Sequence, residues 1–508
     1  MSENIPLWWL VVVVIAFAFM MLGFIFYLRK QNKRQIDLKD ELSEAESTRE
    51  FVQTDKLVVR EVNIPIAVAK LKLHNIRSFS TLDLGFATPT DSRAGQWTVI
   101  LGDNGVGKST ILRGLVLALA HPDIATAVLQ TQRSPAPFIR RTQKLGTIEL
   151  TINGQLQYEV QLQLSARSRS EKLEVKKAAE ERPALLAYGP LRGSALGGAA
   201  RRVSFSAIDQ VATLFDESAQ LIHAETWLGQ AQLAALQTRG GADEAFFDSV
   251  IKTLVKLLPG VDSIKVTSTG VELTGPEVGK DVPLAAMSDG YVGTLGWVLD
   301  FMARWCYRYQ QLTGKPPDGE IAKQMSGLVV VDEIGLHLHP RWQTTVVQEL
   351  RTQFPKMSFI VTSHHPLLLL GAREGEIHVL RRHPETREIT IEQANIPPGT
   401  TADQILTGRW FNLSSTLDED TKHLLEEHRS LLRAGKGEED PLVQDLEDRL
   451  RGRLGTFADT SIDRMALSVA SDVMKGKESS FDKLSQTEKE KIREEMEQEL
   501  RSRIERMS

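Results

Sequence analysis

The chain has 508 residues, which is room for two or three domains and a sizeable hydrophobic core. Charged residues make up 25% of the sequence and the formal net charge is −5, which argues against a strongly basic protein that binds nucleic acid through its overall charge. A local basic patch is still compatible with these values. The single cysteine, Cys306, excludes an intrachain disulfide and a zinc site made of several cysteines.

Residues 6–28 carry no charge and are almost entirely large and apolar. As a helix they would be about 34 Å long, enough to cross a bilayer. Basic residues follow at once at positions 29–34 and none precedes the segment, so we expect a single-pass helix in the cell inner membrane with its N-terminus outside. A cleaved signal peptide is the alternative, but there is no basic start and no small-residue cleavage motif. Residues 29–65 would then be a polar cytoplasmic linker.

A glycine-rich motif follows the first globular residues. Alternating apolar positions over residues 66–84 predict two strands with Arg77 in the turn between them. The apolar residues 97–101 predict a strand that leads into G-x-x-x-x-G-K-S, and helix-like spacing begins after Thr110. Strand, glycine loop and helix in this order are typical of a P-loop. The expected phosphate-binding residues are Gly102, Asp103, Asn104, Gly105, Val106, Gly107, Lys108, Ser109 and Thr110.

The chemistry of a P-loop assigns roles to these positions. Glycines let backbone N–H groups turn inward around a polyphosphate, and the helix N-terminus adds partial positive charge. Lys108 is then expected to reach the β- and γ-phosphates, and Ser109 to ligate Mg²⁺. ATP and Mg²⁺ are therefore the expected cofactors.

The next stretch predicts a mixture of strands and helices. Alternation over residues 147–164 around Asn153-Gly154 predicts a β-hairpin with a type I′ turn, followed by a loop at 166–182 and a strand from residue 184. Residues 205–257 predict helices, and residues 264–266 and 271–273 predict short strands. Between the glycine-rich motif and residue 287 lie roughly 180 residues, too few for long paired coiled-coil arms.

Two carboxylates end a second apolar strand. Residues 327–331 are glycine and large aliphatic residues, and Asp332 and Glu333 follow. Open α/β sheets bind ligands at the carboxyl ends of their strands, so these acids are candidate site residues. Histidines come next at positions 337 and 339, and again at 364 and 365 after another strand. Zinc binding by these histidines is an alternative, although no cysteine lies near them.

Together these motifs resemble the ABC/SMC class of AAA-family ATPases, which includes RecF- and OLD-like proteins and the ATPase subunit of Septu-type anti-phage systems. The resemblance covers residues 66–415. It is carried by the P-loop, the sequence Ala-Tyr-Gly-Pro-Leu-Arg at 187–192, Ser288-Asp289-Gly290, Glu333-x-x-x-His337-Leu-His339-Pro and Thr362-Ser-His364-His-Pro. Two departures stand out: the apolar N-terminal segment, and the lack of room for the Toprim nuclease of OLD proteins.

The resemblance implies an α/β fold, a P-loop NTPase head with a mixed β-sheet core, an antiparallel β lobe and a helical lobe. By resemblance to the Walker B motif, Asp332 would hold Mg²⁺ with Ser109, and Glu333 would activate the attacking water. His364 would sense the γ-phosphate, and Lys108 would complete the catalytic set. Ser288, Asp289 and Gly290 resemble a signature motif that binds the ATP of a partner subunit, although Ser288 suits a helix N-cap equally well. A homodimer closed on ATP and a separate effector protein are the implied partners.

Residues 416–508 are charged and predict helices, the last opening at a capping box that starts at residue 485. The expected function is a membrane-anchored ATPase that acts as a sensor or regulator in anti-phage defence. One alternative is a RecF-like protein that binds DNA through basic residues such as Arg140, Arg141 and those at 167–177. The other is the nucleotide-binding subunit of a membrane complex.

Overall fold

The computed structural model divides the chain into two compact units, the first ending at Phe411 and the second beginning at Asn412. The predicted membrane segment 6–28, the linker up to residue 59 and the last predicted helix lie outside the described residues. Within the described part of the chain, no helix is long and apolar enough to cross a membrane. The described residues are 60–131, 138–154, 157–166, 171–177, 181–191, 205–238, 241–268, 270–397, 399–411, 413, 415–436 and 440–454.

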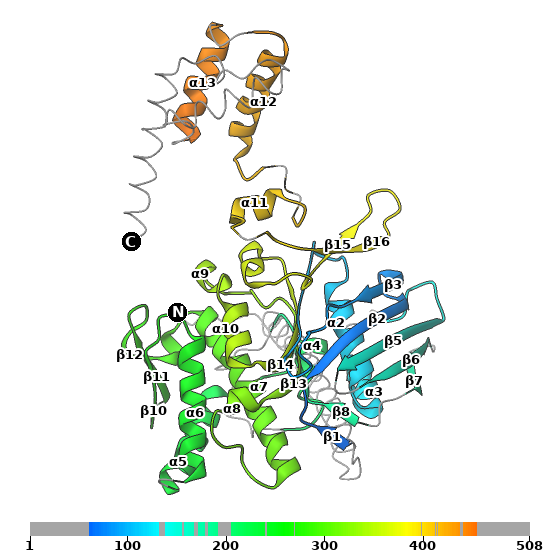
Figure 1. Cartoon of the computed structure of the whole chain (residues 1–508), viewed down its shortest axis with the longest axis vertical. Coiled ribbons are helices and arrows are strands. Elements are labelled where there is room, and N and C mark those ends of the chain that lie inside the picture. Colours follow the sequence, from blue (N-terminus) through cyan, green and yellow to red (C-terminus); the bar gives the residue numbers. More distant parts are fainter. Residues whose placement is uncertain are drawn as a thin grey trace, which may run out of the picture. The chain divides into compact units, whose positions relative to one another are not determined.

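A mixed sheet forms the centre of the first unit, with the strand order β16-β15-β4-β14-β13-β9 (Figure 1). The neighbours from β15 to β9 pair in parallel, and β16 is antiparallel to β15. The apolar runs of β4, β13 and β14 are almost wholly buried, as expected for parallel strands covered on both faces. The strands are β4 (Trp97–Gly102), β9 (Leu185–Tyr188), β13 (Ser326–Val331), β14 (Lys356–Ser363), β15 (Ile377–Arg382) and β16 (Ile389–Ala394).

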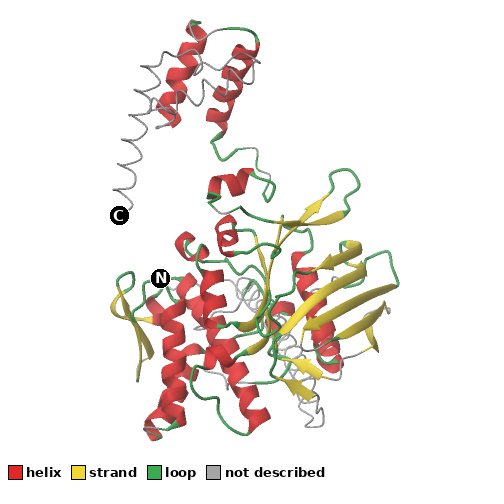
Figure 2. Cartoon of the chain, in the orientation of Figure 1, coloured by secondary structure: helices red, strands yellow, loops and turns green. Residues whose placement is uncertain are grey.

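An antiparallel sheet of order β3-β2-β5-β6-β7 forms a lobe beside the central sheet (Figure 2). Helix α2 (Lys108–Leu119) lies between the two sheets, and its apolar residues share one buried core with both of them. Helix α3 (Pro122–Thr131) packs against α2 and β7. The strands of this lobe are β2 (Ile66–Ile76), β3 (Phe79–Gly85), β5 (Leu145–Gly154), β6 (Tyr158–Ala166) and β7 (Glu171–Lys177).

Two predictions about this lobe are wrong. The β5–β6 pairing closes at Ile152 and Tyr158, while Asn153 and Gly154 pair with β2 and so extend the strand instead of forming a type I′ turn. The expected loop at 166–182 contains β7 and the short strand β8 (Glu181–Pro183), which pairs with β1 (Arg60–Val62). In β7, Leu173 and Val175 pack on the lobe's core while charged residues alternate with them.

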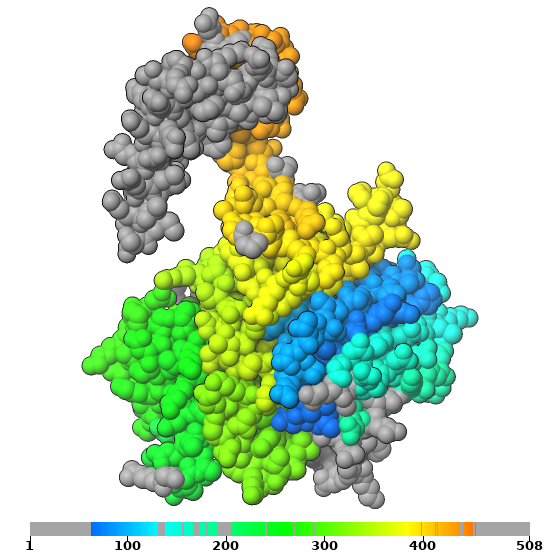
Figure 3. Space-filling model, in the orientation of Figure 1, coloured from blue at the N-terminus to red at the C-terminus, as the bar shows by residue number. Residues whose placement is uncertain are grey.

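Helices cover the opposite face of the central sheet and share a second core with it. The helices expected within residues 205–257 are confirmed, and a three-stranded sheet follows them, with one strand more than the sequence predicts. In the space-filling view the green surface of these helices is separated from the blue and cyan antiparallel lobe by yellow-green residues (Figure 3). The elements are α4 (Ala212–Phe215), α5 (Ala224–Gln237), α6 (Ala242–Leu257), β10 (Ser263–Thr267), β11 (Gly270–Gly275), β12 (Gly279–Pro283), η1 (Leu284–Ala286), α7 (Asp289–Thr313), α8 (Ile321–Gln324), α9 (Pro340–Gln343), α10 (Val346–Gln353), η2 (Pro366–Gly371) and α11 (Ala402–Thr407).

The second unit contains two packed helices, α12 (Glu419–Arg433) and α13 (Pro441–Leu454). Leu424, Leu446 and Leu450 are buried between them. Asp418 caps α12 by accepting a hydrogen bond from the backbone N–H of Thr421. The helical character that the sequence predicts for this region is therefore confirmed in its described part.

Candidate nucleotide-binding site

The glycine-rich segment forms the loop between β4 and α2, as predicted. Gly102, Gly105 and Gly107 adopt φ angles of +150°, +79° and +103°, a region that L side chains rarely occupy. Space adds a second constraint, because a Cβ on Gly107 would lie 2.6 Å from Cζ of Phe79. The loop shape therefore requires glycine at position 107 for two independent reasons.

The N-terminus of α2 faces this loop without a side-chain cap. Its N-cap residue is Gly107, and its first turn contains no acidic side chain. The N–H groups of a first helical turn have no partner within the helix, and the helix dipole adds partial positive charge there. Such a turn beside a cavity is suited to bind an anion.

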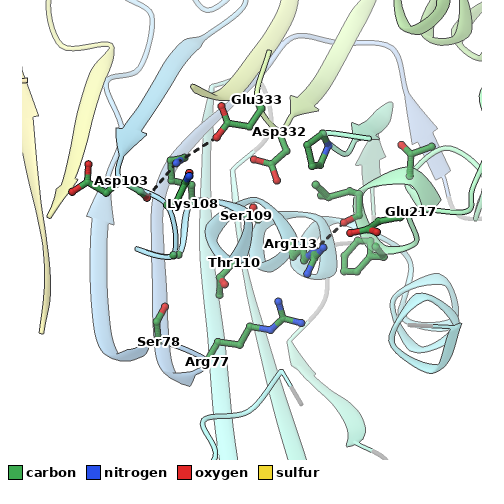
Figure 4. Close-up of a pocket in the computed structure, with 17 residues that line it drawn as sticks. Arg77, Ser78, Asp103, Lys108, Ser109, Thr110, Arg113, Glu217, Asp332 and Glu333 are labelled. Carbon is green, nitrogen blue, oxygen red and sulfur yellow. Dashed lines mark hydrogen bonds and ion pairs between the residues drawn. The ribbon is translucent and has the colours of Figure 1, made fainter. Parts of the chain in front are cut away.

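A cavity of about 460 Å³ opens in front of the loop, within the size range of small-molecule sites (Figure 4). The P-loop supplies one wall, and the turn between β2 and β3 and the residues that follow β13 supply others. A further wall comes from Pro190 after β9 and, around α4, from Thr213, Leu214, Phe215 and Glu217. Of the expected phosphate-binding residues, the cavity is lined by Asp103, Asn104, Gly105, Gly107, Lys108, Ser109 and Thr110.

The two carboxylates at the end of β13 line the same cavity. Asp332 is 2% exposed, and its backbone N–H donates to the carbonyl of Tyr188 at 2.8 Å. The Thr362 hydroxyl on the neighbouring strand donates to the Asp332 carboxylate and accepts the backbone N–H of Glu333 at 2.8 Å. One buried hydroxyl thus fixes both acidic residues.

Lys108, Glu333 and His364 form a connected group at the cavity. The Lys108 ammonium, which is 6% exposed, donates to the carbonyl of Gly102 at 2.7 Å and lies 3.4 Å from a carboxylate oxygen of Glu333. The other Glu333 oxygen lies 2.7 Å from Nδ1 of His364. The structure therefore brings together the three residues that the sequence assigns to catalysis. Glu333 holds a positive φ of +52°, uncommon for a residue with a side chain.

Two basic groups near the acids have shifted pKa values. Burial lowers the pKa of the Arg113 guanidinium, an effect opposed by Asp332 and then Glu217. Burial also lowers the pKa of His365, with a further contribution from His364, while Glu333 acts in the opposite direction. His365 therefore favours its neutral form beside Glu333.

The residues expected to act in a partner's site lie elsewhere. Ser288 is the N-cap residue of α7, but its side chain makes no capping hydrogen bond, and neither it nor Gly290 lines the cavity. Of the four histidines considered as zinc ligands, only His364 and His365 have rings in recorded contact among the described residues, 4.2 Å apart. His339 Nδ1 accepts the backbone N–H of Arg341, and His365 lies against Gln343. Among the residues that the structure describes, no cluster of three or more His, Cys, Asp or Glu side chains could hold a metal ion.

Several cavity residues were not predicted. Thr362 does not line the cavity but contacts both acids. The sequence offers it only as the start of the motif Thr362-Ser-His364-His-Pro, although a threonine inside the buried run of β14 indicates that its hydroxyl has a buried partner. Arg113 comes four residues after Ser109 on α2, so helical spacing alone places both on one face. Thr213 and Glu217 come from a segment far away in sequence, for which no local pattern exists. Arg77, which the sequence places in the turn between two predicted strands, lines the cavity.

Two models of AAA domains match this chain. One, described as an AAA domain, matches residues 70–193. The other, described as "AAA domain, putative AbiEii toxin, Type IV TA system", matches residues 230–370. Both lie within the first unit, and together they contain the glycine-rich loop and both carboxylates.

Curated relatives point in the same direction. The Septu protein PtuA from Bacillus mycoides (strain KBAB4) is 26% identical over 372 residues, which cover 72% of this chain and 47% of PtuA. The retron Vc95 probable ATPase from Vibrio cholerae serotype O1 biovar El Tor is 29% identical over 188 residues, which cover 37% of this chain and 34% of that protein. The chain thus matches less than half the length of either relative.

Among solved structures, the SMC head domain from Thermotoga maritima aligns with 16% identity and a TM-score of 0.35, covering 65% of this chain and 99% of that chain. The fold of this chain is defined by its own strand order and P-loop, without reference to that similarity. Residues 70–193 and 230–370 are thus similar to AAA domains, and the chain is similar in sequence to Septu PtuA and to the retron ATPase.

Proposed function

We propose that this chain hydrolyses ATP to ADP and phosphate in the cavity at the start of α2. The observation that carries the proposal is the group Lys108–Glu333–His364 in contact beside an uncapped P-loop helix. A cation for the phosphates, a carboxylate for the water and a polar side chain that orients the carboxylate are the parts that phosphoryl transfer to water requires.

The cavity also fits a magnesium ion. Mg²⁺ prefers hard oxygen ligands and keeps several waters, and the Ser109 hydroxyl and Asp332 carboxylate line the same cavity. These two residues would hold the ion, Ser109 directly and Asp332 through its water shell. When bound, Mg²⁺ neutralises charge on the β- and γ-phosphates.

The chain's own groups then have separate tasks. The loop amides and Lys108 bind the polyphosphate, and Glu333 accepts the proton of the attacking water. His364 holds one Glu333 oxygen, which leaves the other directed to the Lys108 side of the cavity. Thr362 keeps Asp332 and Glu333 at a fixed separation. Catalysis of this kind depends on positioning and on preorganised charge.

The site would be completed by a second copy of the chain. Ser288 and Gly290 lie at the start of the 25-residue helix α7 but outside the cavity of their own protomer. Their N-terminal helical position suits a γ-phosphate held by a partner. We therefore place ATP between two heads, with Ser288, Asp289 and Gly290 acting across the interface.

The names of the relatives suggest the biological setting. Similarity to a Septu protein and to a retron ATPase supports a role as sensor or regulator in anti-phage defence, together with a separate effector protein. The apolar segment 6–28 would anchor the ATPase to the inner membrane with the head in the cytoplasm. For DNA binding, two of the three lysines of β7, Lys176 and Lys177, already pair with Glu174 and Glu159.

The test is phosphate release by the full-length chain carrying Glu333→Gln. Loss of the base should lower kcat by at least about a hundredfold while ATP binding persists. Glu392→Gln, on the exposed face of β16, is the matched control and should behave as wild type. Unchanged phosphate release by Glu333→Gln would refute the assignment.

A further inference from the structure

Strand β15 runs beside the strand that leads into the P-loop. Its residues 377–380 pair in parallel with residues 99–102 of β4, and the last pair joins Leu380 to Gly102. The two backbones are in direct contact there, because a Cβ on Gly102 would lie 2.7 Å from the carbonyl oxygen of Leu380. Strand β15 continues for two residues past this pair, in a hairpin with the antiparallel β16 (Figure 1). The end of β15 therefore lies alongside the P-loop itself.

Arg382, the last residue of β15, binds the tip of the P-loop. Its Nη2 donates a hydrogen bond to the carbonyl of Gly105 at 2.8 Å, across 277 positions of sequence. Nη1 of the same guanidinium lies 3.5 Å from the carbonyl of Arg387 in the hairpin turn. A guanidinium presents its donors in a rigid planar fork, so the second contact orients the first. Arg382 is exposed and does not line the nucleotide cavity, so it reaches the loop from outside.

The hairpin turn that supports Arg382 is closed by several hydrogen bonds. The N–H of His383 donates to the carbonyl of Glu388 at 2.8 Å, and the N–H of Arg387 donates to the carbonyl of His383 at 3.0 Å. Nδ1 of His383 accepts the N–H of Glu385 at 3.3 Å. Arg387 has a φ of +58°, an angle that a non-glycine residue keeps only where its surroundings enforce it. The guanidinium of Arg382 thus has a fixed support within its own hairpin.

The carbonyl groups of the P-loop point in two directions. That of Asp103 accepts a hydrogen bond from the Lys108 ammonium at 3.3 Å and so points into the loop, whereas that of Gly105 points out to Arg382. In a planar trans peptide the C=O and the following N–H point in opposite directions. The N–H of Val106 accordingly points inward, to the carbonyl of Asp103 at 3.5 Å. This length is at the limit of a hydrogen bond, so the N–H remains available to a stronger acceptor.

An inward N–H at this position suits a phosphate oxygen. Backbone N–H groups of a glycine-rich loop surround bound anions, and Gly105 and Gly107, on either side of Val106, line the cavity. Gly105 has a φ of +79°, and a Cβ there would meet nothing within 4 Å, so packing does not fix the orientation of its peptide. With the peptide reversed, a carbonyl oxygen would face the phosphate in place of the N–H. The hydrogen bond from Arg382 opposes that reversal.

We propose that Arg382 is a positioning residue of the P-loop, which holds the Gly105 carbonyl outward and thereby keeps the Val106 N–H directed at a polyphosphate. Arg382 acts through the loop and does not touch the nucleotide. The inference rests on the proposed function, because the polyphosphate is that of ATP, but it concerns binding and involves no step of hydrolysis. It makes the β15–β16 hairpin part of the nucleotide site, although the hairpin lies outside the cavity.

The test measures how ATP and inorganic tripolyphosphate bind to the full-length chain carrying Arg382→Ala. Both ligands should bind about five- to tenfold more weakly than to wild type, and by the same factor, because the weakened contact is one to phosphate. Arg373→Ala is the matched control, since Arg373 is an exposed arginine in the loop before β15 that does not line the cavity, and this variant should bind as wild type. A loss confined to ATP would place the effect at the base or the ribose and overturn the proposal, as would equal affinities in the two variants.

Salt separates a hydrogen bond from general attraction between Arg382 and an anion. Raising the salt from about 0.1 M to about 1 M shortens the Debye length from about 10 Å to about 3 Å. The ratio of wild-type to Arg382→Ala affinity should stay the same within about twofold, because a hydrogen bond to a carbonyl does not depend on long-range attraction. A ratio that falls to one in high salt would make Arg382 an attracting charge and overturn the positioning role.

Turnover and unfolding separate positioning from a loss of structure. Arg382→Ala should raise the KM for ATP by the same factor as it weakens binding and leave kcat within about twofold, which is the result of losing a contact shared by ground state and transition state. The midpoint of urea unfolding should not move, because the side chain is exposed at the end of a strand. A lower midpoint together with a lower kcat would mean a structural role and contradict the proposal.

The two proposals fail separately. If wild type binds ATP and tripolyphosphate but releases no phosphate, the proposed hydrolysis fails and the binding comparison still tests Arg382. If wild type is active and Arg382→Ala binds both ligands as wild type does, only the role of Arg382 fails.

Discussion

Thr362→Val removes one hydroxyl from the centre of the site and keeps the size of the side chain. Thr362 is fully buried, donates to the Asp332 carboxylate and accepts the N–H of Glu333. The variant leaves both groups without this partner while the strand β14 keeps its apolar packing. It therefore isolates the contribution of a hydroxyl that joins the two acids.

The expected cost follows from these two contacts. A hydrogen bond to a charged group contributes roughly 1.5–3 kcal/mol, and an unsatisfied buried N–H costs about 1–3 kcal/mol. The additional buried methyl group offsets about 0.8 kcal/mol. We expect Thr362→Val to lower the free energy of unfolding by about 2–5 kcal/mol. Because Glu333 loses its anchor, kcat for ATP should fall by at least about tenfold.

Urea unfolding followed by tryptophan fluorescence measures the first quantity and phosphate release the second. Thr98→Val is the matched control, since Thr98 is fully buried on the adjacent strand β4 and its hydroxyl has no hydrogen-bond partner among the described residues. That variant should change stability by less than about 1 kcal/mol. Similar losses in the two variants would refute the role assigned to Thr362, as would a stable and fully active Thr362→Val.

Three further predictions concern the same unit. Lys108→Met should weaken ATP binding by at least about tenfold in a titration, because it removes the buried cation of the cavity; unchanged affinity would exclude Lys108 as a phosphate ligand. Gly107→Ala should abolish nucleotide binding, since the Cβ meets Phe79 and φ is +103°, whereas Gly105→Ala, with open space around it, should be milder. Burial lowers the pKa of His378 from 6.5 to about 4, so as the pH falls the unfolded state takes up the proton before the folded state does. The free energy of unfolding should therefore fall by about 3 kcal/mol between pH 6.5 and 4. His378→Leu should flatten this part of the pH profile of unfolding, and an unchanged profile would contradict the prediction.

The parts of the site that the sequence predicts are those with a local pattern. In the P-loop a strand, the motif G-x-x-x-x-G-K-S and a helix follow one another directly, and the apolar run before Asp332 marks a buried parallel strand by itself. Each of these patterns lies in consecutive residues, so it can be found in the sequence without the structure. The same is true of the strands β2 and β3 and of the helices in the second core.

Contacts between segments far apart in the chain have no such local pattern in the sequence. Strand β7 looks like a charged loop because its core-facing side chains, Leu173 and Val175, are outnumbered by Lys and Glu. The Asn153-Gly154 pair suggests a turn, yet pairing with β2 keeps it in β5, a tertiary contact that overrides turn preference. The contact of Gly290 with His337 joins residues 47 positions apart, and nothing in either segment alone predicts it.

Whether ATP is held between two copies of this chain is tested by the mass of the full-length Glu333→Gln chain in solution with and without ATP–Mg²⁺. The mass should double only when ATP–Mg²⁺ is present, and Ser288→Ala in the same background should weaken the doubling. A mass that stays the same at saturating ATP, with binding confirmed in the same sample, would contradict it.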